Sequence, residues 1–234
     1  MSSILINIHV IIKLGVRMIK NKEHGLLIVV SGPSGSGKST LDNLILERRK
    51  NIVMSISDTT RKIRGKEVDG VDYNFITTEQ FEENIKNNKY LEYASVYTGT
   101  YYGTPEEFVN KKLASGIDVI LEIDIEGAKK IKEKRSDAIF IFIMPPSMKV
   151  LKERLVSRKT ETKEQVIERF KTAYKEINEF NKYNYVIVND DIDIALSKMD
   201  AIITSEKCRV DRIEELDVGN REEIMHEILV DFEK

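Results

Sequence analysis

The stretch LLIVVSGPSGSGKS, residues 26–39, gives the clearest indication of the fold. Its first part, residues 26–31, is apolar and rich in β-branched side chains, as is typical of a strand buried on both faces. Its second part, residues 32–39, matches G-x-x-x-x-G-K-[ST], a pattern in which backbone N–H groups surround phosphate oxygens. A helix beginning here would direct its positive amino-terminal end at the same phosphates. The stretch therefore predicts a nucleoside triphosphate site between a strand and a helix.

Two side chains of this loop have specific roles in such a site. Lys38 would reach the β- and γ-phosphates, and the Ser39 hydroxyl would ligate Mg²⁺. The motif alone is shared by GTPases, ATPases and small-molecule kinases. The predicted ATP-binding residues are Gly32, Pro33, Ser34, Gly35, Ser36, Gly37, Lys38, Ser39 and Thr40.

The composition of the chain limits its class. The 234 residues are 41 % hydrophobic and 32 % charged, and the opposite charges nearly cancel to a net charge of −2. No long basic block occurs, so we expect neither nucleic acid nor a membrane surface as a partner. The single cysteine, Cys208, excludes an intrachain disulfide and a zinc site built from cysteines, which fits a reducing compartment such as the cytoplasm.

The first 24 residues form an extension before the globular pattern. The run ILINIHVII, residues 4–12, is far shorter than the roughly 20 residues that a membrane helix needs. No basic residue precedes it and no small-residue cleavage site follows it, so it fits a secretory signal poorly. Translation from Met18 is one hypothesis for this extension; an extra strand or a flexible tail is the other.

Further along, short apolar runs alternate with helical segments. Residues 118–123, 138–144 and 185–188 resemble the first strand, and this alternation predicts an α/β fold with a mostly parallel sheet and helices on both faces. Thr104, followed by Pro105, suggests a capping box at the start of one helix, and Gly116 suggests its end. Thr162 begins a similar pattern.

Two regions interrupt the alternation. Residues 58–103 are polar and contain short strand-like pieces and one helix, capped by Thr77 with Gln80. Residues 147–181 form a charged helical pair, and residues 207–234 an acidic tail that we expect to be helical. The intervening core comprises residues 25–57, 104–146 and 182–206.

Carboxylates follow one predicted strand. Glu122 and Asp124 lie where the strand 118–123 ends, and ligands of parallel sheets bind at the carboxyl ends of strands. These side chains can hold Mg²⁺ through water or orient an acceptor. The alternative is that they simply solvate the strand end.

A second anion site is suggested by TTRKIRGKEVDGVDYNF, residues 59–75. Arg61 and Arg64 can bind phosphate through their guanidinium groups, and Tyr73 adds a hydroxyl donor. Arginines in a surface loop can also serve solubility alone. Two facing phosphate sites would indicate transfer between nucleotides rather than hydrolysis.

The same stretch resembles the signature of the guanylate kinase family. The resemblance continues through YLEYA (residues 90–94), YYGTP (101–105), LEIDIEGA (121–128), PPS (145–147) and VNDD (188–191), and it covers about residues 25–206. It implies a P-loop mononucleotide kinase fold in which residues 58–103 bind GMP and residues 147–181 are a mobile lid. The implied reaction is ATP + GMP giving ADP + GDP, with dGMP as a second acceptor and Mg²⁺ bound with ATP.

The resemblance also assigns residues. Arg61, Arg64, Tyr73 and Tyr102 would hold the phosphate of GMP. Ser57, Glu92 and Thr104 would line the guanine pocket, with Asp124 nearby and Glu122 beside it. Lys38 would act with the lid arginines Arg154, Arg158 and Arg169 in catalysis, and Asn189 would contact adenine.

Chemistry independently favours guanine. Guanine presents its N1–H and N2–H₂ donors side by side, and the carboxylate of Glu92 can accept from both, whereas adenine offers an acceptor at N1. A site with an unpaired buried polar group rejects the wrong ligand by orders of magnitude.

Several residues depart from the family pattern or have a second interpretation. Thr104 is also a natural helix N-cap, and Arg154 and Arg169 lie where pairing with glutamates is common. Asp42 places an acid in the first turns of the cradle helix, where the family tends to be apolar or basic. Other departures are Ile63, Gly65, Lys66, Glu126, Lys159 and one extra residue between Glu92 and Tyr102. A non-catalytic phosphopeptide-binding module of the same fold is the alternative function, and the oligomeric state is left open.

Overall fold

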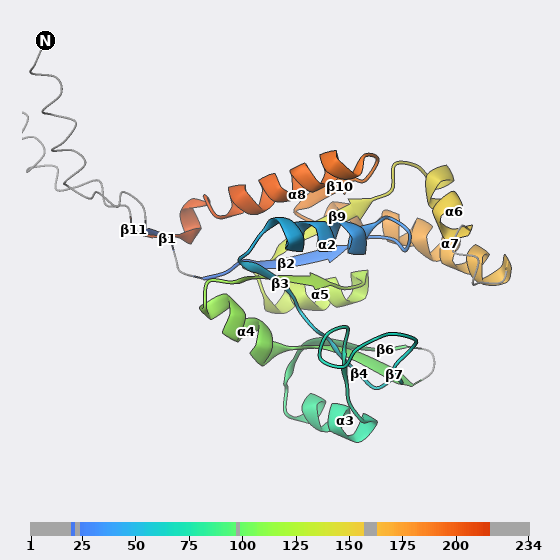
Figure 1. The fold of residues 1–234 in the computed structure, drawn as a ribbon, viewed down its shortest axis with the longest axis horizontal. Helices are drawn as coiled ribbons and strands as arrows, with labels where there is room; N and C mark the ends of the chain where they lie inside the picture. Colours follow the sequence, from blue (N-terminus) through green and yellow to red (C-terminus); the bar gives the residue numbers. More distant parts are fainter. Residues whose placement is uncertain (1–19, 22–23, 97–98, 157–162, 216–234) are drawn as a thin grey trace, which may run out of the picture. The chain divides into compact units, whose positions relative to one another are not determined.

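A computed structural model describes residues 20–21, 24–96, 99–156 and 163–215 (Figure 1). The predictions about the translation start, Arg158, Lys159, Thr162 and residues 216–234 fall outside these ranges. Residues 1–22 and 204–234 group as one unit, and residues 23–203 as the other.

The larger unit is organised around a five-stranded parallel sheet. Its strands are β2 (Leu27–Ser31), β3 (Ile52–Met54), β8 (Asp118–Glu122), β9 (Ile139–Met144) and β10 (Tyr185–Val188). Their spatial order is β10-β9-β2-β8-β3, and every neighbouring pair is parallel. The predicted α/β class is confirmed, and each predicted strand is present to within one residue at its ends.

Helices cover both faces of this sheet (Figure 1). Because side chains alternate along a strand, Ile28 and Val30 of β2 pack on one side and Leu27 and Val29 on the other. The first side is covered by α2 (Lys38–Arg48) and α8 (Ile192–Glu206). The second is covered by α4 (Glu106–Ala114) and α5 (Ile125–Lys134).

The polar insertion has its own small sheet and core. Its strands β4 (Asp58–Thr59), β5 (Asn74–Phe75), β6 (Tyr90–Val96) and β7 (Thr100–Pro105) pair in the order β5-β4-β7-β6. The helix α3 (Thr78–Lys86) places the fully buried Phe81 against Tyr90 and Tyr101, with ring centroids 4.5 and 5.1 Å away. A Cβ at Gly103 would lie 2.9 Å from the Phe81 ring, so the sheet approaches these rings closely.

The predicted helical pair is also present. It consists of α6 (Met148–Val156) and α7 (Lys163–Ile177), and a short 3-10 helix, η1 (Phe180–Lys182), precedes β10. Leu151 and Leu155 of α6 pack with Ala173 of α7 in a separate apolar cluster. The pair is therefore held by its own contacts.

Of the three predicted helix boundaries that lie in the described residues, two are confirmed. Thr77 and Gln80 form the expected capping box of α3. Gly116 has a φ of +74° just after α4, a conformation that glycine adopts most easily. The capping box at Thr104 is wrong, because Pro105 is the N-cap of α4 and the Thr104 hydroxyl is bonded elsewhere, as described below.

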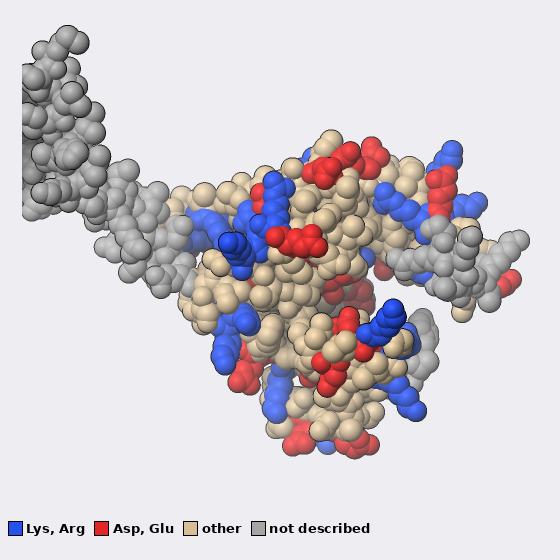
Figure 2. All heavy atoms as spheres, viewed as in Figure 1, with Lys and Arg blue, Asp and Glu red and all other residues tan. Residues whose placement is uncertain are grey.

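The smaller unit contains an antiparallel pair of short strands. β1 (Lys20–Asn21) pairs with β11 (Ile213–Glu215), which follows the 3-10 helix η2 (Val210–Arg212). The expected helical tail is thus wrong for residues 213–215, because their backbone pairs with the amino-terminal strand. In the ranges that the structure describes, none of the helices has the length and apolarity to span a bilayer. Basic and acidic side chains are interspersed over the face shown in Figure 2.

Candidate active site

Backbone geometry builds the phosphate cradle between β2 and α2. Gly32 and Gly37 have φ of +150° and +93°, a region that L side chains rarely adopt. A Cβ would lie 2.3 Å from the Ile143 carbonyl oxygen at the first position and 2.3 Å from Nδ2 of Asn189 at the second. These two glycines are therefore required both by their conformation and by the close packing of the loop.

Side chains from distant elements hold the cradle in shape. Nδ2 of the buried Asn189 donates to the Ser36 carbonyl oxygen at 2.8 Å. Arg154 of α6 donates to the carbonyl oxygens of Ser36 and Asn189 at 3.4 and 3.2 Å. Nζ of Lys38 donates to the carbonyl oxygen of Gly32 at 2.6 Å. The sequence anticipated nucleotide contacts for Asn189 and Arg154; the structure adds this bracing role.

Two cavities adjoin the cradle. A cavity of about 490 Å³ is within the size range of small-ligand sites and is lined by Gly35, Gly37, Thr40, Arg154, Asn189, Asp190 and Ile192. A second, of about 220 Å³, is lined by Ser34, Gly35, Gly37, Lys38, Ser39, Thr40 and Glu122. The second is predominantly polar in its residues and lies directly at the helix amino terminus, so it suits phosphate groups.

Helix α7 brings two charged side chains to the same loop. Arg169 donates a hydrogen bond to the Ser34 hydroxyl, and the Glu176 carboxylate accepts from the Ser34 N–H. Burial raises the pKa of Glu176, while the Lys38 charge acts in the opposite direction. Sequence reasoning missed Glu176, although its position seven residues after Arg169 places both on one helix face.

Acidic groups lie beside Ser39. The Ser39 hydroxyl donates to Oε1 of Glu122 at 2.9 Å, so Glu122 lies at the cradle. Asp42, one turn further along α2, is fully buried. Across the described ranges, no group of three or more His, Cys, Asp or Glu side chains could hold a metal ion, so a cation here would need hydroxyl, water or phosphate ligands as well.

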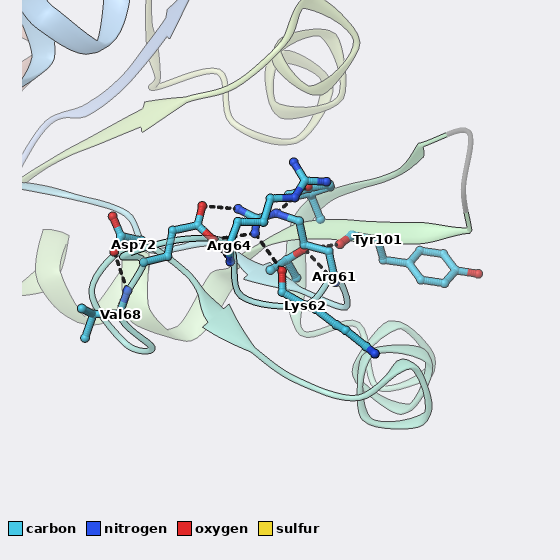
Figure 3. Close-up of polar contacts among 9 residues, drawn as sticks. Arg61, Lys62, Arg64, Val68, Asp72 and Tyr101 are labelled. Atoms are coloured by element: carbon cyan, nitrogen blue, oxygen red, sulfur yellow. Dashed lines mark hydrogen bonds and ion pairs between the residues drawn. The ribbon is translucent and has the colours of Figure 1, made fainter. Parts of the chain in front are cut away.

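Figure 3 shows Arg61 and Arg64 on the loop of the insertion where the sequence predicts a second phosphate site. Nε of Arg61 donates to the Tyr102 hydroxyl at 3.0 Å, and the Arg61 guanidinium lies 4.7 Å from the centre of the Tyr73 ring. The rings of Tyr73 and Tyr102 meet edge to face at 5.8 Å. Arg64 is exposed beside this cluster. Arg61, Tyr73 and Tyr102, which the family resemblance groups together, therefore lie in contact with one another.

Glu67 is a member of this cluster whose role sequence reasoning missed. Its two oxygens accept from Nη1 and Nη2 of Arg61, both at 2.6 Å, and Oε2 also accepts from the Arg64 N–H at 2.8 Å. The hydrogen bond from Arg61 lowers the pKa of Glu67 to about 2. Their spacing of six residues within a loop gives no helical or strand register, so only the opposite charges could have indicated the pair.

A buried carboxylate lies on the sheet of the insertion. Glu92 is 6 % exposed, and its Oε1 accepts from the Thr104 hydroxyl at 2.8 Å. Burial raises the pKa of Glu92, the bond from Thr104 lowers it, and the charge of Asp124 raises it. Oε2 of Glu92 and Oδ1 of Asp124 both approach Gly127. The structure thus brings Glu92, Thr104 and Asp124 together.

Asp124 and Ser57 also have local roles. Oδ1 of Asp124 accepts from the Gly127 N–H at 2.7 Å, which makes Asp124 the N-cap of α5. The carbonyl oxygen of the half-buried Ser57 accepts from the Asn74 N–H. Asp124 therefore caps α5, in addition to the role near Mg²⁺ or the acceptor that the sequence predicts for it.

Comparison with known proteins identifies the family. Residues 24–206 match the family model described as Guanylate kinase. The chain belongs to the guanylate kinase family. A guanylate kinase of Clostridium perfringens (strain SM101 / Type A) is 52 % identical over 213 residues, which cover 91 % of this chain and 98 % of that protein. A guanylate kinase of Caldanaerobacter subterraneus subsp. tengcongensis is 54 % identical over 202 residues, covering 86 % and 98 %.

A solved structure supports the same assignment. The crystal structure of guanylate kinase from Anaplasma phagocytophilum aligns with a TM-score of 0.68 at 36 % identity, covering 84 % of this chain and 93 % of that one. The chain is accordingly a nucleoside monophosphate kinase, and membership of the guanylate kinase family supports phosphorylation of GMP by ATP. The enzyme interpretation is confirmed over the alternative of a non-catalytic module.

Proposed function

We propose that this guanylate kinase transfers the γ-phosphoryl group of ATP to GMP and dGMP in a Mg²⁺-dependent reaction that releases ADP and GDP or dGDP. The observation that carries the proposal is the buried carboxylate of Glu92, held by Thr104 within the same unit as the phosphate cradle. A carboxylate there can accept both N1–H and N2–H₂ of guanine. A protonated carboxyl group, or a glutamine in its place, cannot accept both of these hydrogen bonds.

The proposed acceptor site pairs this base recognition with a phosphate site. Arg61, braced by Glu67 and by the Tyr102 hydroxyl, supplies a fixed positive charge. Arg64 is exposed beside it and free to rotate toward a phosphate, and Tyr73 adds a hydroxyl. Neither the base contacts nor these phosphate contacts involve the ribose 2′-hydroxyl, which is why dGMP is included.

On the donor side, the residues present fit a magnesium ion with its nucleotide. The Ser39 hydroxyl and the neighbouring Glu122 are hard oxygen ligands of the kind that Mg²⁺ prefers. Asp124 would act, if it contributes, through water. When bound, Mg²⁺ neutralises charge on the transferring phosphoryl group. Lys38 would add a positive charge at the same phosphates.

We assign the helical pair, residues 147–181, to closure over ATP. Arg154 and Arg169 already reach the cradle from α6 and α7, and Arg158 would join them. During transfer, the bond between the γ-phosphorus and the β,γ-bridging oxygen breaks, and a bond to a GMP phosphate oxygen forms. Closure would keep water from competing as the acceptor. We infer a cytoplasmic location from the single cysteine, Cys208.

Product analysis tests this proposal directly. The purified enzyme would be incubated with ATP and either GMP or dGMP, with Mg²⁺ or with excess EDTA, and the nucleotides separated by chromatography. We expect equal amounts of ADP and GDP, or ADP and dGDP, only when Mg²⁺ is present. ADP without GDP would indicate hydrolysis, and full activity in EDTA would contradict the magnesium requirement.

A further inference from the structure

Asp42 is a buried acid for which the proposed reaction gives no role. It lies four residues after Lys38 and three after Ser39 on α2, so all three share one helix face. The residue is 0 % exposed, and neither carboxyl oxygen has a hydrogen-bond partner in the described part of the chain. Buried carboxylates in proteins are normally paired or bound to a cation, because an isolated one is costly.

A second carboxyl group lies next to Asp42. Glu122, at the end of β8, lies close enough to Asp42 for the two charges to interact, and Lys38 is the positive charge near them. Two neighbouring carboxylates repel each other, so a divalent cation bound between them would stabilise the pair.

We propose that Asp42, Glu122 and the Ser39 hydroxyl form a divalent-cation site that binds Mg²⁺ or Mn²⁺ in the absence of nucleotide. The Ser39 hydroxyl lies 2.9 Å from Oε1 of Glu122, which provides a third oxygen close to the pair. The polar cavity of about 220 Å³ gives a cation a route from solvent to Ser39 and Glu122, which line it. Carboxylate and hydroxyl oxygens are suitable ligands for both metals.

The inference deepens the magnesium part of the proposed function and rests on Ser39 lying at the metal position. It adds that this chain binds the cation before ATP does. The reason is that Asp42 contributes a second negative charge, in place of the negative charge of the ATP phosphates. The extra charge comes from Asp42, which is fully buried on α2.

Mn²⁺ titration of the nucleotide-free protein, followed by electron paramagnetic resonance of free Mn²⁺, tests this site. We expect one Mn²⁺ per chain, displaced by excess Mg²⁺, and an increase of the melting temperature with either ion. In Asp42→Asn and in Glu122→Gln the affinity should fall by about 10- to 100-fold or more. Glu47→Gln removes a charge from an exposed position of the same helix and should bind as the wild type does.

Two results would overturn the inference. One is an unchanged Mn²⁺ affinity in Asp42→Asn, whose folding is checked by circular dichroism; the other is no stoichiometric binding by the wild type. Turnover of GMP measured on the same preparations separates the two proposals. Normal turnover without nucleotide-free binding removes the cation site alone. Mn²⁺ binding without GMP turnover removes the proposed reaction and leaves the cation site.

Discussion

The cradle on the ATP side and the insertion on the GMP side are both proposed to bind phosphate, but they are built differently. The cradle at residues 32–39 relies on backbone geometry: its glycines pack against Ile143 and Asn189, and its N–H groups need no side chain. The insertion relies on side chains, because Arg61 is held by Glu67, Tyr73 and Tyr102. The cradle should therefore tolerate few glycine substitutions, whereas the insertion depends on its ring and ion-pair contacts.

The two halves also share a feature. In each, a glutamate contacts a group expected to bind phosphate: Glu176 lies at the Ser34 N–H in the cradle, and Glu67 binds Arg61 in the insertion. Each of these groups therefore has a carboxylate partner within the chain. The difference lies in what holds each carboxylate, a helix in the first case and a loop in the second.

The largest effect is expected at the cradle. Lys38→Ala removes the positive charge nearest the transferring phosphoryl group, and kcat should fall by at least about 100-fold. The thermal unfolding transition should stay close to that of the wild type, since the Lys38 ammonium group donates to the carbonyl oxygens of Gly32 and Pro33 within the cradle itself. Steady-state kinetics alongside Lys50→Ala, an exposed lysine after α2, provides the comparison; near-normal turnover would refute the role of Lys38.

The next effect concerns base recognition in the insertion. Glu92→Gln replaces an acceptor by a group with a donor, so kcat/KM for GMP should fall by about 100-fold or more, from two lost charged hydrogen bonds. The KM for ATP should change little, because the ATP site is built by other elements. Equal losses for both substrates would show that Glu92 serves the fold rather than guanine.

A substitution in the core of the insertion tests whether the insertion can be destabilised without affecting the cradle. Phe81→Ala empties the space between Tyr90 and Tyr101 and should destabilise the insertion by about 3–5 kcal/mol. Denaturant unfolding measures this loss. If the halves are as distinct as their construction indicates, the variant should keep ATP binding to the cradle while losing GMP binding. Simultaneous loss of both would show that they fold as one unit.

The pH dependence gives a smaller effect with a defined direction. Because burial raises the pKa of Glu92, this group takes up a proton on acidification earlier than an ordinary glutamate does. The KM for GMP should therefore rise as the pH falls, while the KM for ATP should not follow it through Glu92. Between the ordinary glutamate pKa of the unfolded chain and the raised pKa of the folded protein, the folded state binds more protons at Glu92. The free energy of unfolding should therefore fall as the pH rises through this range. A pH profile for GMP that Glu92→Gln leaves unchanged would contradict the assignment.

The smallest effect is expected at the brace of Arg61. Glu67→Gln keeps the shape but weakens the bidentate pair, so the KM for GMP should rise several-fold with a smaller change in kcat. Because the pKa of Glu67 is about 2, this brace persists at every neutral or mildly acidic pH. Glu82→Gln on α3 is the matched control in the same insertion. A lower KM for GMP in Glu67→Gln would mean that Glu67 competes with the phosphate instead.

The sequence predicted the parts that depend on local pattern. The strands of the parallel sheet, the cradle and the capping box of α3 all follow from short-range periodicity and residue type. The bond between Thr104 and Glu92 was not predicted, because a threonine before Pro-Glu-Glu has the same local pattern as a helix cap. The pairing of Glu67 with Arg61 and the burial of Asp42 were not predicted either, because both depend on how the folded chain packs.

The tail shows the same limit. Residues 213–215 pair with residues 20–21, about 190 residues away in sequence, and no local pattern encodes that pairing. In contrast, Arg61, Tyr73 and Tyr102 lie in contact, and only the family resemblance, which carries long-range information that periodicity lacks, had grouped them.

Acceptor specificity is the most direct test of the whole account. The measurement is kcat/KM for ADP formation from MgATP with GMP, AMP, CMP and UMP as acceptors. A buried carboxylate matched to guanine predicts that GMP exceeds AMP by about 10⁴-fold or more. A site built around such hydrogen bonds discriminates by far more than about 10-fold. A kcat/KM for AMP within about 10-fold of that for GMP would therefore contradict the proposed role of Glu92.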